Sequence, residues 1–226
     1  MTYTIGIIGG TGREGRGLGY RWAQAGHKVI IGSRSEEKAL AAVDELNERL
    51  HGEGEVSGTT NDKAVLACDI AVLTVPFSAH RETLEGLKEE LQGKILIDVA
   101  VPLVPPKVTR VQMPEEGSAA QQAQAILGDD VKVVAAFQTI SFERLLSNEE
   151  IECDVLVAGG DKACLLYTSD AADDLLCVDL GGRRIIKKKT HILPLTNTSY
   201  TQTHTIVTNV TSITQHYTPT TTPLLH

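Results

Sequence analysis

A glycine-rich turn near the start of the chain carries the residue spacing of a dinucleotide-binding site. Gly10, Gly12 and Gly15 follow the apolar run Ile5–Ile8 and precede a helical spacing that begins at Leu18. In this spacing the first glycine permits a tight turn, the second lets backbone approach a pyrophosphate, and the third lets the helix pack on the strand. The positive end of the helix then faces the phosphates. The pattern favours dinucleotide binding over the alternative, a structural turn that binds nothing.

The residues after this turn complete a βαβ unit. Helical spacing ends at Ala25-Gly26, a natural C-terminal stop, and the apolar stretch 27–32 is typical of a second buried strand. The unit therefore closes in about thirty residues, as the dinucleotide-binding fold requires.

The end of the second strand indicates which dinucleotide binds. An NAD site places Asp or Glu there to accept hydrogen bonds from the ribose, but this chain has Gly32-Ser33-Arg34. A hydroxyl and a guanidinium can hydrogen-bond a 2′-phosphate, and Lys38 adds a second cation. The alternative is that Ser33 or Ser35 only caps the next helix and that Arg34 is a solvated surface charge. The missing acid favours NADP.

Composition narrows the class of protein. The chain has 226 residues, 42% of them hydrophobic, and a net charge of -8, which argues against a nucleic-acid partner. No apolar run approaches the length of a membrane span, and the first strand begins at once, so we expect a cytoplasmic protein without a membrane partner. The four cysteines have no metal-ligand spacing, and we expect no metal site.

Strand and helix patterns continue to alternate along the chain. We expect helices over 35–50, 61–68, 78–91 and 118–127, and strands near Val56 and over 69–75, 94–99, 131–137 and 154–157. Such alternation is typical of an α/β fold with a doubly wound parallel sheet, the Rossmann type. Pro76 and Phe77 then lie at the carboxyl end of a strand, the edge where ligands bind in open α/β sheets.

Several segments in this order resemble one enzyme family. The segments GGTGREG, GSRSEEKA, CDIAVLTVPF, DVAVPLVPPKVTRVQMPEEGSAAQQAQ, VVAAFQTIS and CDVLVAGGDKA are similar to those of the NADPH-dependent reductases of the 8-hydroxy-5-deazaflavin coenzyme F420. The likeness covers residues 1–163, which we take as an NADP-binding Rossmann domain. It implies hydride transfer between NADPH and coenzyme F420, with the deazaflavin as a small-molecule co-substrate.

The resemblance also implies roles for individual residues. The pyrophosphate would be lined by Thr11, Gly12, Arg13 and Glu14, the 2′-phosphate by Ser33, Arg34 and Lys38, and the nicotinamide half by Phe77. Three positions would lie near the meeting point of nicotinamide and deazaflavin: Val104, Gln138 and Phe142. Because the cofactors carry the reactivity, we expect no catalytic side chain, and we interpret His80 as a residue on a helix surface.

The resemblance stops at Cys164, where the family would continue with a helical segment that completes the deazaflavin pocket and the homodimer contact. Back-translation of Cys164 to Asp173 gives a string similar to a sequencing-library transposase adapter, and Cys177 to Ile186 gives one similar to a flow-cell primer. Residues 190–226 contain thirteen threonines and no charged residue other than histidine. We interpret 164–226 as a non-native tail with few contacts to 1–163; the alternative is a natural Thr-rich region.

Two other functions stay open at this point. The chain could be a different NADP-dependent reductase of the β-hydroxyacid or imine type, or a non-catalytic module that senses NADP. The first of these usually places its acid on a long helix after the nucleotide domain, and no such helix is predicted here. The segment VPLVPPKVTRVQMPEEGSAA favours the deazaflavin reductase.

Overall fold

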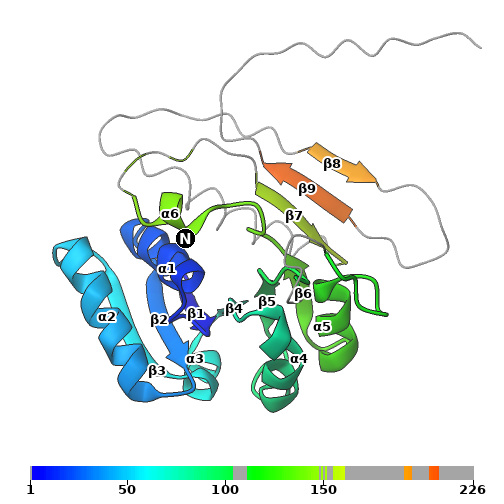
Figure 1. Cartoon of the computed structure of the whole chain (residues 1–226), viewed down its shortest axis with the longest axis horizontal. Helices are drawn as coiled ribbons and strands as arrows, with labels where there is room; N and C mark the ends of the chain where they lie inside the picture. The colour runs from blue at the N-terminus through cyan, green and yellow to red at the C-terminus, as the bar shows by residue number, and fades with distance from the viewer. Residues whose placement is uncertain are drawn as a thin grey trace, which may run out of the picture.

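The chain is built around one twisted sheet (Figure 1). A computed structural model describes residues 2–103, 111–147, 149, 151, 155–160, 191–194 and 204–208. The strand order is β3-β2-β1-β4-β5-β6-β7-β9-β8. The strands are β1 (Thr4–Ile8), β2 (Lys28–Ser33), β3 (Glu55–Thr60), β4 (Ile70–Leu73), β5 (Ile95–Asp98), β6 (Lys132–Ala135), β7 (Val155–Gly159), β8 (His191–Pro194) and β9 (His204–Thr208).

Strands β1 to β6 pair in parallel, and β7 runs antiparallel to β6. The order reverses at β1, whose neighbours are β2 and β4. This is the doubly wound Rossmann arrangement that the alternation of strands and helices predicts, with a crevice at the switch point. The antiparallel direction of β7 was not expected.

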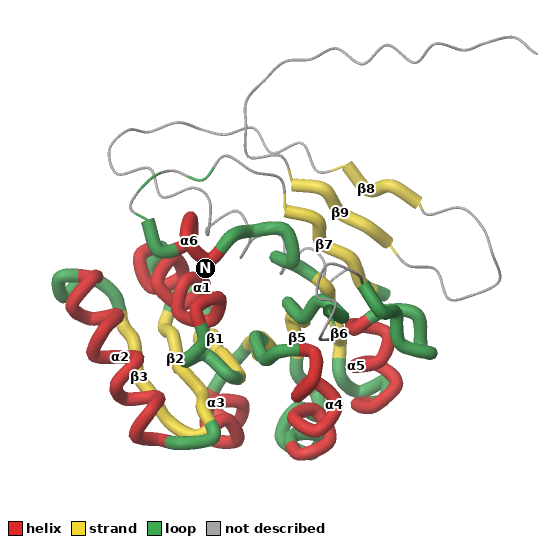
Figure 2. The backbone as a smooth tube through the Cα atoms, in the orientation of Figure 1, coloured by secondary structure: helices red, strands yellow, loops and turns green. Residues whose placement is uncertain are grey.

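Helices cover both faces of the sheet (Figure 2). They are α1 (Arg13–Gln24), α2 (Glu36–Leu50), α3 (Asn61–Ala67), α4 (Phe77–Gly86), α5 (Ala119–Leu127) and α6 (Phe142–Leu145). One core joins α1, α2 and α6 to the sheet, and Trp22 of α1 meets Phe137 edge-on within it. The other core joins α3, α4 and α5 to the opposite face. Two closed cores hold the strand ends in place, which is what a site at the sheet edge requires.

Local sequence explains where several helices begin. The Ser35 hydroxyl accepts a hydrogen bond from the Lys38 amide at 3.5 Å and caps α2, and Ser118 caps α5 in the same way through the Gln121 amide at 3.2 Å. Helix α4 is shorter than the expected 78–91: it ends at Gly86, and turns follow over 87–93. Helix α6 was not expected.

Two short strands of the region 164–226 extend the sheet. Strand β9 pairs antiparallel with β7 over five registered positions, from Val155 opposite Thr208 to Gly159 opposite His204, and β8 pairs with β9. For β9, this is more contact with residues 1–163 than we expected. The physical reason is that the free edge of β7 offers unpaired backbone groups, with which an alternating segment can pair. The other residues of this region lie outside the described ranges.

The described residues contain neither a membrane-spanning helix nor a cluster of metal ligands. No helix among them is long and apolar enough to cross a membrane. No group of three or more histidine, cysteine, aspartate or glutamate side chains in the same ranges is placed to hold a metal ion.

Candidate nucleotide-binding site

One cavity of about 1000 Å³ lies at the carboxyl ends of β1, β2, β4 and β5. Eight of the residues that we expected to contact a dinucleotide line it: Thr11, Gly12, Arg13, Glu14, Ser33, Arg34, Lys38 and Phe77. Further lining residues come from the ends of β4 and β5 and from helix α4, among them Thr74, Val75, Glu82, Val99 and Val101. The fold therefore brings the glycine turn, the cationic end of β2 and Phe77 into one continuous cavity.

The three glycines of the motif have different surroundings. A Cβ added at Gly12 would meet only the Gly9 carbonyl oxygen at 3.6 Å, so the space beside Gly12 is open. At Gly15 an added Cβ would lie 2.6 Å from Gly10 Cα and 2.8 Å from Thr74 Oγ1. At Gly10 it would lie 2.9 Å from the Ile7 carbonyl oxygen. Gly10 and Gly15 are thus needed for packing, whereas Gly12 leaves room for a ligand.

Sequence reasoning missed two residues that shape this turn. Gly9 has φ +72°, and an added Cβ would lie 2.6 Å from Val75 Cγ1. The Gly9 amide donates a hydrogen bond to Asn61 Oδ1 at 3.1 Å. The same Asn61 oxygen would lie 2.9 Å from a Cβ added at Gly32. Asn61 at the start of α3 therefore ties the glycine turn to the end of β2. The only sequence signal was the adjacency of Gly9 to the motif.

The three residues that we expected to contact a 2′-phosphate lie at or just after the end of β2 and line the cavity; the contacts themselves stay predictions. Ser33 is buried, and its hydroxyl accepts a hydrogen bond from the Ser35 amide at 3.3 Å. Ser35, not Ser33, caps the following helix. Arg34 and Lys38 are exposed, and neither forms an ion pair within the described part of the chain. Both cations are thus free to meet an anionic ligand.

Glu14 lies in the first turn of α1 and faces this cavity. One of its carboxylate oxygens, Oε1, is buried and has no hydrogen-bond partner among the described residues. Burial raises the pKa of Glu14 to about 7, because a carboxylate removed from water loses solvation that nothing replaces. The side chain therefore changes charge near neutral pH.

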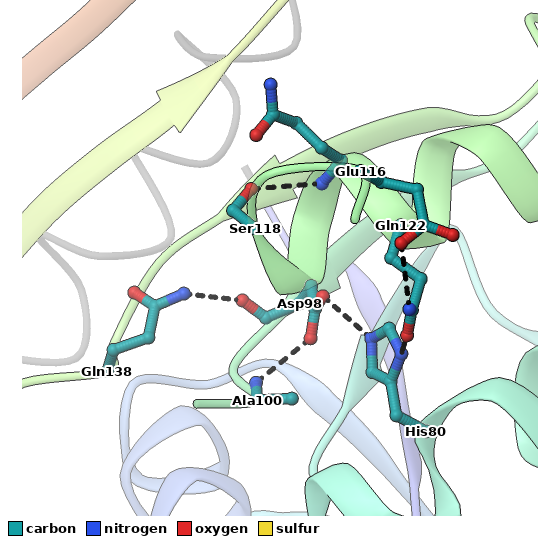
Figure 3. Close-up of polar contacts among 8 residues, drawn as sticks. His80, Asp98, Ala100, Glu116, Ser118, Gln122 and Gln138 are labelled. Carbon is teal, nitrogen blue, oxygen red and sulfur yellow. Dashed lines mark hydrogen bonds and ion pairs between the residues drawn. The ribbon is translucent and has the colours of Figure 1, made fainter. Parts of the chain in front are cut away.

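The interpretation of His80 as a helix-surface residue is wrong. His80 and Asp98 are both fully buried, and Figure 3 shows His80 between Asp98 and Gln122. His80 Nε2 lies 3.0 Å from Asp98 Oδ2, and His80 Nδ1 lies 3.2 Å from Gln122 Oε1. The reason is tertiary: α5 covers this face of α4 and brings Gln122 over the histidine. A signal was present in Asp98, an acid that directly follows the apolar run 95–97.

Of the three residues expected at the meeting point of the two cofactors, Gln138 and Phe142 are not among those that line the large cavity. Val104 lies outside the described residues. Gln138 donates a hydrogen bond from Nε2 to the Asp98 carbonyl oxygen at 2.8 Å, which fixes it beside the end of β5. Phe142, under the Arg13 guanidinium at 5.2 Å from its ring centre, lines a separate cavity of about 160 Å³. Arg13 lines both cavities and connects them. The cofactor contacts of these residues stay predictions.

The parallel sheet, the glycine turn at its switch point and the cationic end of β2 together define a dinucleotide-binding domain of the NADP-dependent oxidoreductase class. Residues 4–102 match the family described as "NADP oxidoreductase coenzyme F420-dependent". The F420-dependent NADP reductase of Methanothermobacter thermautotrophicus is 38% identical over an alignment of 206 residues, and the match covers 85% of this chain and 88% of that protein. The enzyme of the same name from Methanocaldococcus jannaschii is 36% identical, and the match covers 87% of this chain and 93% of that enzyme. The chain belongs to this family.

Two solved structures are similar to this chain in fold. A crystal structure from Arthrobacter sp. FB24, a candidate F420-dependent NADP reductase, has a TM-score of 0.64 at 23% identity and covers 76% of this chain and 81% of its own. The 1-pyrroline-5-carboxylate reductase of Streptococcus pyogenes has a TM-score of 0.53 at 15% identity, and the match covers 77% of this chain and 56% of that chain. Both likenesses concern the fold.

The sequence match to the Methanothermobacter enzyme covers 85% of this chain, whereas residues 1–163 are only 72% of its 226 residues. The match therefore extends past residue 163.

Proposed function

We propose that this protein transfers a hydride between NADPH and the deazaflavin coenzyme F420. The observation that carries this conclusion is the 38% identity to an F420-dependent NADP reductase along 88% of its length. The cavity agrees with it, because it has room at a glycine turn for a pyrophosphate and free cations at the end of β2.

The residues present fit NADP. The open space at Gly12 suits the close approach of a pyrophosphate to backbone, and the start of α1 directs its positive end there. Arg34 and Lys38 are free to bind a 2′-phosphate, and the Ser33 hydroxyl lies beside them. Thr11, Arg13 and Glu14 would surround the pyrophosphate, each from the turn or the first turn of α1. The chain's task is to bind and orient the dinucleotide in one pose.

The cofactors supply the redox chemistry: the nicotinamide carries the hydride and the deazaflavin ring exchanges it. The chain must hold the two rings in contact and exclude water from between them. Phe77 and the apolar residues Val99 and Val101 form the wall of the cavity at the ends of β4 and β5, which supports the nicotinamide half at this end. We propose that Val104, Gln138 and Phe142 lie on the deazaflavin side.

A spectrophotometric assay tests this function. The protein used carries the C-terminal segment of a family member in place of residues 164–226, because that segment is expected to complete the deazaflavin pocket. With this protein NADPH should bleach the absorbance of the oxidised deazaflavin, and NADH should do so far less, because it lacks the 2′-phosphate. Parallel reactions with a small cyclic imine and with a 2-oxoacid test the other reductase type. Tight NADPH binding without consumption of any of these substrates would indicate the sensing module instead.

Three further proposals come from the sequence. We propose that residues 164–226 are a non-native tail and that, as the family resemblance implies, a helical segment stands there in other members. The family resemblance likewise supports a homodimer, which light scattering after size-exclusion chromatography tests. The composition of the chain supports a cytoplasmic location and no nucleic-acid partner, and fluorescence microscopy of a tagged protein tests the location.

A further inference from the structure

A chain of hydrogen-bonded polar groups, three of them buried, lies beside the end of β5 (Figure 3). It begins at Glu116 in the loop before α5, passes through Gln122 and His80, and ends at Asp98, the last residue of β5. His80 and Asp98 are fully buried, and Gln122 is 7% exposed. None of these side chains lines the cavity, so the proposed function has not accounted for them.

The direction of each hydrogen bond in this chain can be worked out from its outer end. Hydrogen bonds from its own backbone amide and from Gln122 lower the pKa of Glu116, so this side chain is a carboxylate that only accepts. Glu116 also pairs with Arg81 at 2.8 Å. Gln122 therefore donates from Nε2 to Glu116 Oε2, at 3.1 Å. A reversed Gln122 amide would set its oxygen against the carboxylate, acceptor against acceptor.

This fixes what His80 must do. Gln122 turns its oxygen toward His80 Nδ1, so Nδ1 carries a hydrogen and donates. On the other side, Asp98 Oδ1 accepts from the Ala100 amide at 2.9 Å, while Asp98 Oδ2 faces His80 Nε2. One hydrogen lies between Oδ2 and Nε2, and it belongs on the more basic partner; an imidazole is more basic than a carboxylate, so Nε2 carries a hydrogen as well. The geometry thus points to a doubly protonated imidazole paired with a buried carboxylate.

The groups that this pair holds are those of the cavity wall. Asp98 fixes the backbone of Ala100 through its side chain, and its carbonyl oxygen accepts the hydrogen bond from Gln138. Val99, Ala100 and Val101 line the cavity. On its other side, the His80 ring packs against the Phe77 ring, with 5.4 Å between ring centres and 33° between planes. One imidazole thus couples the start of α4 to the end of β5.

We propose that His80 is a positioning residue which, by donating from both ring nitrogens, fixes the segment from Asp98 to Val101 and the Phe77 ring at the nicotinamide end of the cavity. It touches neither the cavity nor the glycine turn. Its loss therefore changes the rate of hydride transfer more than the binding of NADPH. This kinetic consequence rests on the proposed function, whereas the protonation of His80 does not.

Nitrogen-15 NMR of the full chain with labelled histidine tests the protonation state directly. His27 is an internal control: it is also buried, but its Nδ1 accepts a hydrogen bond from the Tyr3 amide at 3.1 Å and so carries no hydrogen. We expect protonated-type shifts at both nitrogens of His80 at pH 7 and one unprotonated nitrogen at His27. The charged members of the hydrogen-bonded chain that includes His80 are Asp98, Glu116 and Arg81. His80→Gln, which removes one set of signals, assigns the resonances. An unprotonated nitrogen at His80 would overturn the proposal.

A substitution at Asp98 separates positioning from binding. Asp98→Asn keeps an oxygen for the Ala100 amide but turns an amide donor toward His80 Nε2, so His80 must give up that hydrogen. We expect the NMR signature of a neutral ring, a kcat lowered about tenfold or more, and a Kd for NADPH within about threefold of the original. The matched control is Asp69→Asn. Asp69 also accepts a hydrogen bond from a backbone amide, that of Thr4 at 2.8 Å, but it lies at the amino ends of the strands, away from the cavity. It should leave kcat and Kd unchanged.

The outcomes separate two failures. If a protein that carries the C-terminal segment of a family member in place of residues 164–226 binds NADPH and has the doubly protonated His80 but reduces no deazaflavin, the proposed function fails and the protonation state of His80 stands. If it reduces deazaflavin and Asp98→Asn does so at an unchanged rate, the positioning role is wrong. A loss of NADPH affinity equal to the loss of rate would also contradict positioning and indicate general damage to the site.

Discussion

The glycine turn gives a sharp test of where the cofactor lies, because its three motif glycines differ in what surrounds them. We predict that Gly12→Val abolishes NADPH binding and leaves the fold intact. Gly12 precedes α1 with φ -69° and ψ 165°, a backbone conformation open to valine. Its added Cβ would meet only one atom within 4 Å, the Gly9 carbonyl oxygen at 3.6 Å.

The magnitude follows from these surroundings. A non-polar side chain at the helix N-cap costs about 0.5 to 1 kcal/mol relative to glycine, and the loss of flexibility in the unfolded chain returns about 0.4 to 1 kcal/mol. The free energy of unfolding should therefore stay within about 1 kcal/mol. The two methyl groups of valine, in contrast, occupy the space that we assign to the pyrophosphate. We expect an affinity loss of at least about 100-fold, or about 2.7 kcal/mol.

The assay combines urea unfolding with calorimetric titration of NADPH into the folded variant. Gly15→Ala is the contrasting variant, because its Cβ would lie 2.6 Å from Gly10 Cα, a backbone atom that cannot move away cheaply. It should lose about 1 to 3 kcal/mol of stability. Gly160→Val is the neutral control, since an added Cβ there meets nothing within 4 Å and lies outside the cavity. A folded Gly12→Val protein that binds NADPH normally would refute the placement of the cofactor.

Three further predictions concern charge and the tail. Arg34→Ala should weaken NADPH binding by about 1 to 3 kcal/mol, the scale of a lost charge-assisted hydrogen bond, with little change for NADH; equal losses for both would remove the 2′-phosphate assignment. Because the pKa of Glu14 is raised to about 7 in the folded protein, the free energy of unfolding falls as pH rises from about 4.5 to above 7. Glu14→Gln should abolish about 1 to 3 kcal/mol of that fall, measured by urea unfolding at pH 5 and pH 8. An unchanged slope would show that the Glu14 carboxyl is solvated. Deletion of 164–226 should leave NADPH affinity unchanged, and a deletion that unfolds the domain would contradict the assignment of a non-native tail.

The local parts of this site could be predicted from sequence because they depend on neighbouring residues. Strand, turn and helix from Thr4 to Gln24 follow from apolar spacing and the glycines, and the cations Arg34 and Lys38 follow from their place after β2. The order of the first six strands follows as well, since alternating strands and helices leave few topologies.

The parts that could not be predicted depend on contacts between distant segments. The burial of His80 needs Gln122, which lies 42 residues away and is brought there by the packing of α5 on α4. The antiparallel pairing of β7 with β6 joins residues such as Val134 and Gly159, which are 25 positions apart in the chain. The need for Gly9 depends on its positive φ and on Val75, from a different strand end. Periodicity within a short window contains none of this information.

The most direct test of the proposed activity is an isotope transfer between the two cofactors. NADPH that carries two deuterium atoms at C4 of the nicotinamide is mixed in ordinary water with oxidised coenzyme F420 and protein. Two proteins are compared: this chain, and one in which residues 164–226 are replaced by the corresponding C-terminal segment of the Methanothermobacter thermautotrophicus enzyme. We predict that both proteins bind NADPH. With the second protein, each reduced deazaflavin should contain one deuterium atom, as direct hydride transfer requires. Reduced deazaflavin without deuterium, or NADPH binding by the second protein without reduction, would contradict the account.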